Sequence, residues 1–187
     1  MVKKDQEIEQ NLVLVGIIKK LLSILLLFLS ISLMTIILTF NSTDKGWGVV
    51  SDKTPTNLYD EIGAWLSGLI VKELGVFPGF LLSLILVIWS LKLFNNSKIT
   101  FLKIKLLAIF LLISLSSIGG TYLESILVKT FNLNLLLISQ SGLSEWFLLY
   151  FSNGISKFLD VNFITSELII GASCFVISLI LFIWILS

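Results

Sequence analysis

The sequence predicts an all-α integral membrane protein with four transmembrane helices. Its mean hydropathy is +1.02, and charged residues make up only 13% of its 187 positions. Both values lie far outside the range of soluble globular domains. Four stretches without a charged residue are each long enough to cross a bilayer as a helix. After a cytoplasmic tail at 1–20, the membrane domain at 21–187 is expected to place its spans at 21–40, 74–91, 106–123 and 168–187.

The first two predicted spans have recognisable ends. The first, 21–40, measures about 30 Å as a helix and matches the hydrocarbon thickness of a bilayer. It is too long for the core of a signal peptide and no small-residue cleavage pattern follows it, so we expect it to be retained. The second contains Pro78 in its first turn, where the missing N–H costs nothing. Trp89 near its end is expected to be an interfacial anchor.

The distribution of lysines predicts the orientation of the chain. The tail and the connection between the second and third spans are rich in lysine, and that connection holds no acidic residue. The other two connections hold more acidic residues than lysines. The positive-inside rule therefore places both termini in the cytoplasm and the first and third connections outside. The expected location is the cytoplasmic (inner) membrane, as a multi-pass protein.

Both outside connections contain apolar segments that are too short to span. Residues 57–74 place Leu58, Ile62 and Trp65 on one helical face, as expected for a helix lying in the outer interface. Residues 145–157 are aromatic and about half the length of a span, so they are expected to lie flat or to re-enter the bilayer. Interfacial or re-entrant helices are thus predicted in both connections.

The composition excludes several kinds of chemistry. The chain has no histidine, which removes the usual general base and metal ligand, and a single cysteine, Cys174, cannot form an intrachain disulfide. No Gly-Lys pair occurs, so a phosphate-binding Walker A loop is absent from the sequence. All basic residues are lysines, which leaves no arginine to read guanine. We therefore expect no enzymatic activity, no cofactor or metal, and no direct contact with nucleic acid from these residues.

The connection after the first span contains a spaced pattern. Its members are Asp44, Trp47, Asn57, Gly63, Ala64 and Gly75. They form D-x-x-W, then an asparagine six residues before a Gly-Ala pair, then a glycine twelve residues after the first glycine of that pair. Taken singly, such residues also have a structural interpretation, because Asp and Asn cap turns, Trp lies at headgroup level and small residues let helices approach.

The joint spacing resembles the first outside loop of the four-span N-terminal membrane domain of the FtsK/SpoIIIE family of DNA translocases. That loop typically reads D-P-S-W, then N-x-x-G-x-x-G-A. Here Lys45 and Gly46 replace the proline and serine, and Asp60 replaces the first glycine. A second outside loop beginning with a glycine pair, at Gly119 and Gly120 or near Gly142, is also similar to the family.

The resemblance implies a non-enzymatic anchor that positions and oligomerises a cytoplasmic DNA motor at the division septum. Its implied partners are the lipid bilayer, further copies of the chain and membrane proteins of the division machinery. No lysine follows the fourth span, which indicates either an unusually bare terminus or a chain cut at a domain boundary, and we expect the latter, with a motor beyond Ser187. The alternative is a small polytopic subunit of a transporter. For that role the spans offer serines and threonines, with Glu124 at the end of the third span as the best ionisable candidate, although hydroxyl groups more often join helices.

Overall fold

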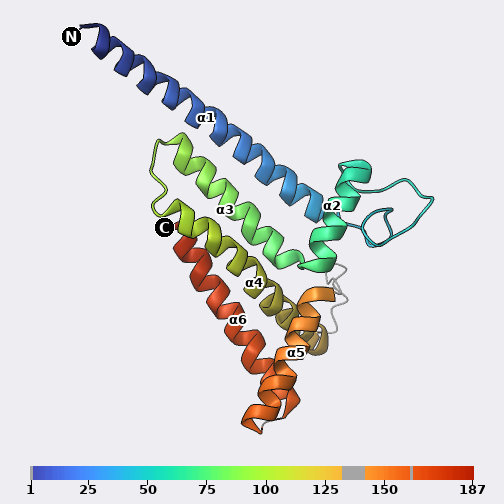
Figure 1. Ribbon diagram of the computed structural model, residues 1–187. Helices are drawn as coiled ribbons and strands as arrows, with labels where there is room; N and C mark the ends of the chain where they lie inside the picture. Colours follow the sequence, from blue (N-terminus) through green and yellow to red (C-terminus); the bar gives the residue numbers. More distant parts are fainter. Residues whose placement is uncertain (1, 132–141, 161) are drawn as a thin grey trace.

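The computed structural model describes the backbone of residues 2–131, 142–160 and 162–187, and the side chains of 13–123, 146–160 and 162–187. The described chain is helical (Figure 1), with helices α1 (Val2–Leu38), α2 (Asp60–Glu73), α3 (Val76–Phe94), α4 (Leu102–Phe131), α5 (Gly142–Leu159) and α6 (Phe163–Leu186). Within the described residues, four segments are long and apolar enough to cross a membrane, namely Val13–Leu38, Val76–Phe94, Leu102–Leu123 and Phe163–Leu186. The predicted all-α class with four membrane helices is confirmed.

All four membrane helices extend beyond their predicted spans at one end or both, α1 and α4 by the most. α1 has 37 residues, about 55 Å of helix, and runs through Lys19 and Lys20 without a break. α4 passes through Gly119 and Gly120, so this glycine pair does not begin a loop. Within the predicted second outside connection, residues 132–141 and the side chain of Glu124 lie outside the described residues. Charge marks where a helix can leave the lipid, whereas the helix itself can continue.

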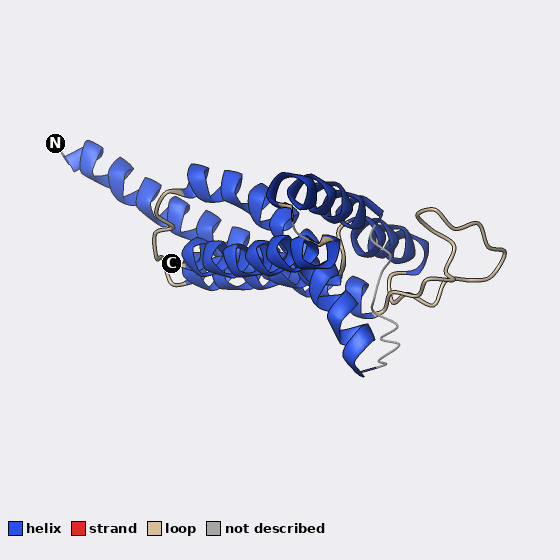
Figure 2. Cartoon of the chain, turned by 90° about the horizontal axis from the view of Figure 1, so that it is seen from below, coloured by secondary structure: helices blue, strands red, loops and turns tan. Residues whose placement is uncertain are grey.

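The four spans lie side by side in an open row (Figures 1 and 2). α1 packs against α3, α4 packs against α6, and α3 joins these two pairs through its contacts with α4 and α6. Both termini and the 95–101 connection lie at one end of the row. The long loop after α1, together with α2 and α5, lies at the opposite end.

Serine hydroxyls join α1 to α3. Ser30 Oγ donates to the carbonyl oxygen of Ser83 at 2.7 Å, and Ser90 Oγ donates to that of Ser23 at 2.8 Å. Moving an apolar side chain from lipid into a helix interface gains little free energy, because both environments are apolar. Hydrogen bonds such as these, together with close packing, therefore hold membrane helices together. These span serines therefore act in helix pairing, which is the role that hydroxyls most often have.

Small residues bring α4 and α6 together. A Cβ atom added at Gly119 would lie 2.6 Å from Phe175 Cα, and one added at Gly171 would lie 2.0 Å from Tyr122 Cγ.

Nearer the end that holds the termini, Trp89 is buried in an apolar cluster with Leu81, Ile85, Leu112 and Ile185. Its Nε1 donates to the Ile185 carbonyl oxygen at 3.4 Å. Trp89 thus packs inside the protein, which differs from the interfacial position that the sequence predicts.

Candidate functional site

All six residues of the spaced pattern lie in one folded unit, which we call the cap. The cap comprises residues 41–75, that is, the loop after α1, helix α2 and the turn into α3. It lies at the end of the row away from both termini (Figure 1). The structure therefore brings the predicted candidates together, and each of them has a definable position.

Asp44 closes the loop upon itself. Its side chain is buried, and its carboxylate accepts hydrogen bonds from the backbone N–H groups of Thr56 and Asn57 at 2.9 and 3.0 Å. The Thr56 hydroxyl donates to the same carboxylate at 3.0 Å. A buried carboxylate is tolerated where several donors compensate its charge, as here. Asp44 and Thr56, twelve residues apart in the chain, are thereby joined at the base of the loop between them.

Asn57 ties the cap to the first span. Its buried Nδ2 donates to the carbonyl oxygens of Ile36 and Thr39 at 3.0 and 3.1 Å. These carbonyls belong to the last turn of α1 and to the residue just after it, where helical carbonyl groups lack backbone partners. Its Oδ1 accepts from the Tyr59 N–H at 3.1 Å. One amide side chain thus caps the end of α1 and sets the turn that leads into α2.

Gly63 and Ala64 lie on the buried face of α2. A Cβ atom at Gly63 would lie 2.0 Å from Asn57 Oδ1, so only glycine leaves room for this amide. Ala64 is 4% exposed, and a Cβ at Gly46 would lie 2.8 Å from its carbonyl oxygen. The buried residues of α2 are small apart from one valine: Gly63, Ala64, Ser67, Gly68 and Val71. The loop therefore folds directly onto a narrow strip of small residues.

Trp47 fastens the loop to the far end of α2. Its Nε1 donates to Glu73 Oε1 at 2.8 Å, and Lys72 Nζ donates to the Trp47 carbonyl oxygen at 3.1 Å. The indole also meets Trp65 edge to face, with ring centroids 5.5 Å apart. A Cβ at Gly68 would lie 3.1 Å from Trp47 Cβ, so glycine here permits the close approach.

Two positive backbone angles mark the ends of α2. Gly75 has φ +93°, and its N–H bonds to the carbonyl oxygens of Ile70 and Val71 as the chain turns into α3. Asp60 has φ +51°, a left-handed conformation that favours glycine. This is the position at which the family pattern has glycine, so the observed backbone explains that preference. At the preceding residue, Tyr59, hydrogen bonding lowers the pKa of the phenol, with the larger effect from Ser32 and the smaller from Thr35.

The larger apolar residues of α2 point the other way. Ile62 is 72% exposed and Trp65 44% exposed, on the face opposite the small residues. With Val49 and Val50 from the loop they line an open groove of about 600 Å³. An ion pair between Lys45 and Glu61, with an N–O distance of 3.3 Å, lies beside it.

The cap is built for structure, since the side chains of Asp44 and Asn57 direct their polar atoms into backbone groups. Among the described residues, no three potential metal ligands gather at one point. Sequence reasoning missed Thr56, Lys72 and Glu73 as members of the cap. The carboxylate of Glu73, directly before an apolar span, was the available signal, because a charge at that depth needs a partner.

A family model described as the 4TM region of DNA translocase FtsK/SpoIIIE matches residues 16–142. The match covers most of α1 and all of α2, α3 and α4, including the whole cap, whereas α6 lies beyond it. No curated protein and no solved structure gave a match. The matched segment is more than half of the chain and agrees with the spacing seen in the sequence. The chain therefore belongs to the FtsK/SpoIIIE family of DNA translocases, as a membrane domain with four membrane helices.

Proposed function

We propose that this membrane domain is a non-enzymatic module that anchors, positions and oligomerises a cytoplasmic DNA motor at the division septum. Family membership supports the link to a DNA translocase. The observation that chiefly supports a positioning role is the convergence of the six pattern residues in the cap. A flexible tether would not require a buried carboxylate that accepts backbone hydrogen bonds, or glycines where the loop packs closely against α2.

The proposed mechanism is placement. Holding a motor at the septum raises its effective concentration where DNA must clear the closing membrane. The proposed partners are the lipid bilayer of the cytoplasmic membrane, other copies of the chain and membrane proteins of the division machinery. In this proposal the segment itself neither hydrolyses ATP nor contacts nucleic acid directly.

Cellular localisation tests the positioning role. In dividing cells, a fluorescent protein fused after residue 187 should gather at the septum, and Gly63→Leu should disperse it because the larger side chain displaces Asn57. Gly154→Ala is the matched control, since a Cβ there meets no atom within 4 Å. Uniform membrane fluorescence of the wild-type fusion would contradict septum positioning, and equal septal signal from both variants would show that the cap has no part in it.

A separate experiment addresses catalysis and self-association. The purified 187-residue chain should hydrolyse no ATP above the rate of a preparation from cells lacking it. In membranes, chemical crosslinking should yield oligomers of the wild type and of Gly154→Ala, and fewer of Gly63→Leu. Turnover that copurifies with the chain would overturn the non-enzymatic assignment, and crosslinks confined to monomers would overturn the oligomerisation role.

A further inference from the structure

Lys105 is the one lysine whose side chain is fully buried among the described residues, with 1% of its surface exposed. Its Nζ has no hydrogen-bond partner among those residues. It lies 5.8 Å from the centre of the Trp184 ring, at the last turn of α6. A buried ammonium group without a counter-charge is strongly unfavourable, and one cation–π contact offsets only part of that cost.

The segments of α3, α4 and α6 that surround this ammonium group contain no acidic residue. No acidic residue occurs between Glu73 and Glu124, or after Glu167, so α3, the first part of α4 and the last five turns of α6 contain none. Lys92 at the end of α3 is already engaged, because its Nζ donates to the carbonyl oxygens of Leu186 and Ser187. Lys92 thus interacts with the negative end of the α6 dipole, and Lys105 has no comparable hydrogen-bond acceptor among the described residues.

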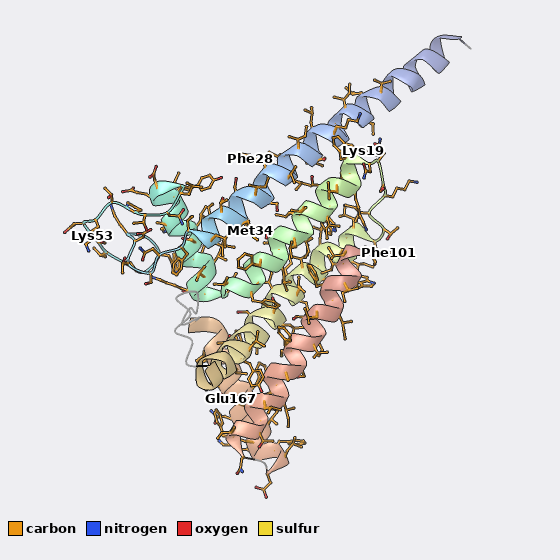
Figure 3. The ribbon with its side chains drawn as sticks, turned by 180° about the vertical axis from the view of Figure 1, so that it is seen from behind. Lys19, Phe28, Met34, Lys53, Phe101 and Glu167 are labelled. Carbon is orange, nitrogen blue, oxygen red and sulfur yellow. The ribbon has the colours of Figure 1, made fainter. Side chains whose placement is uncertain are left out.

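The position of Lys105 on its helix adds further positive potential. It is the fourth residue of α4, whose first turn has no acidic residue and whose first N–H groups lack helical acceptors. Lys98 and Lys103 lie close to it in the chain and are exposed. In Figure 3, Lys19 of α1 lies at the same end of the row as Phe101, just before α4. The charged residues from the end of α3 to the start of α4 are therefore all positive, whereas the acidic residues of α1 lie near its N-terminus, at Asp5, Glu7 and Glu9.

Lys105 lies near one end of its candidate span, within reach of the headgroup layer. Its backbone lies about 4.5 Å along the helix axis inside the span that begins at Leu102, and a lysine side chain is long enough to carry its ammonium group from there to the headgroup layer. The polar layer on each side of the hydrocarbon core is several ångströms thick, and phosphates lie within it. Basic pockets between membrane helices on the lysine-rich side are suited to anionic headgroups.

We propose that Lys105, with the N-terminal N–H groups of α4, binds an anionic phosphate group at the junction of α3, α4 and α6. The phosphate is that of a negatively charged phospholipid headgroup or a free phosphate ion. This site is independent of the proposed septum role. Because the ammonium is covered by Trp184 in its present rotamer, binding requires the lysine side chain to turn toward the headgroup layer.

Thermal unfolding of the purified 187-residue chain in neutral detergent tests this site. Phosphatidylglycerol should raise the melting temperature of the wild type more than phosphatidylcholine does, and Lys105→Met should remove most of the difference. Lys103→Met is the matched control, because Lys103 is exposed in the same helical turn and should keep the response. The apparent affinity for phosphatidylglycerol should fall about tenfold in Lys105→Met, the loss expected for one charge-assisted hydrogen bond.

Additional arms separate the sources and the competing explanations. A response to inorganic phosphate alone would identify a free-anion site, whereas a response limited to phosphatidylglycerol would identify a lipid site. Lys105→Arg should retain binding, and Lys105→Met should melt no lower than wild type in phosphatidylcholine, because it removes an unpaired buried charge. Three results would overturn the proposal. They are equal losses of response in the Lys103 and Lys105 variants, a wild type stabilised no more by phosphatidylglycerol or phosphate than by phosphatidylcholine, and a Lys105→Met variant that is destabilised in every lipid.

Discussion

Asp60 shows how a single residue departs from the family pattern at a strained backbone position. Its φ of +51° lies where glycine is favoured, and its side chain stands at the first turn of α2. The carboxylate suits a helix N-terminus, which offsets part of the conformational cost. The sequence identified the departure, but only the backbone angle explains why glycine is the usual residue there.

This backbone angle predicts an inverted order of two substitutions. At ordinary positions of a helix, alanine is favoured over glycine by up to about 1 kcal/mol. At position 60 we expect Asp60→Gly to be more stable than Asp60→Ala by about 1 kcal/mol, because both remove the charge and only alanine retains a Cβ atom. Unfolding in detergent measures the difference. If alanine proves the better replacement, the left-handed conformation at this residue is wrong.

Asn57 is predicted to need its amide nitrogen. Asn57→Asp replaces the donor that binds the Ile36 and Thr39 carbonyl groups with a carboxylate oxygen. We expect the free energy of unfolding to fall by at least about 2 kcal/mol, since two carbonyls lose their donor beside a new negative charge. Asn153→Asp, on an exposed position of α5, should change it by less than about 0.5 kcal/mol. Similar effects of the two substitutions would remove Asn57 from the cap's supporting contacts.

At the scale of elements, helices were predictable where their pattern is local. Charge-free length indicated the four spans, and the apolar face of 57–74 indicated α2. What α2 packs against was not predictable, because its buried face is the strip of small residues around Gly63, not the large apolar face. Gly63 makes room for an amide oxygen six residues earlier, a contact that no helical periodicity encodes.

That contact predicts how the cap responds to one methyl group. Gly63→Ala should lower the free energy of unfolding by about 1 to 3 kcal/mol, as in overpacked cores, because its Cβ atom collides with Asn57. The loop should then be cut faster by protease added on its own side of the membrane. Gly154→Ala, with open space around it, should be neutral or stabilising by up to about 1 kcal/mol. Equal cleavage rates for the two variants would mean that the cap is a loose tether.

At the scale of the whole molecule, the order of the spans depends on contacts that are spread along the chain. Ser30 meets Ser83, and Gly119 meets Phe175, across separations that a sequence pattern does not relate. Trp89 illustrates the same limit, since the sequence favours an interfacial position and the packing of α3 on α6 buries it. The number of spans follows from composition, whereas their neighbours follow from which small and hydroxyl residues face one another.

The arrangement of the ends leads to a prediction of topology. In Figure 3, Lys53 lies at one end of the row, whereas Lys19 and Phe101 lie at the other, so the loop after α1 and the 95–101 connection face opposite sides of the bilayer. The lysine bias predicts that the 95–101 connection faces the cytoplasm. With Cys174 replaced by alanine, we expect Thr54→Cys to react with an impermeant maleimide in intact cells stripped of any outer membrane. Ser97→Cys should react only after lysis.

Both positions are exposed, and both substitutions leave every lysine in place, so the charge bias that sets the orientation is unchanged. The two possible failures have different meanings. Labelling of Ser97→Cys alone in intact cells would preserve the four-span arrangement and reverse its direction, so that the cap would face the cytoplasm. Equal labelling of both positions in intact cells would contradict the four-span arrangement itself, because it would place the two ends of α3 on the same side of the membrane.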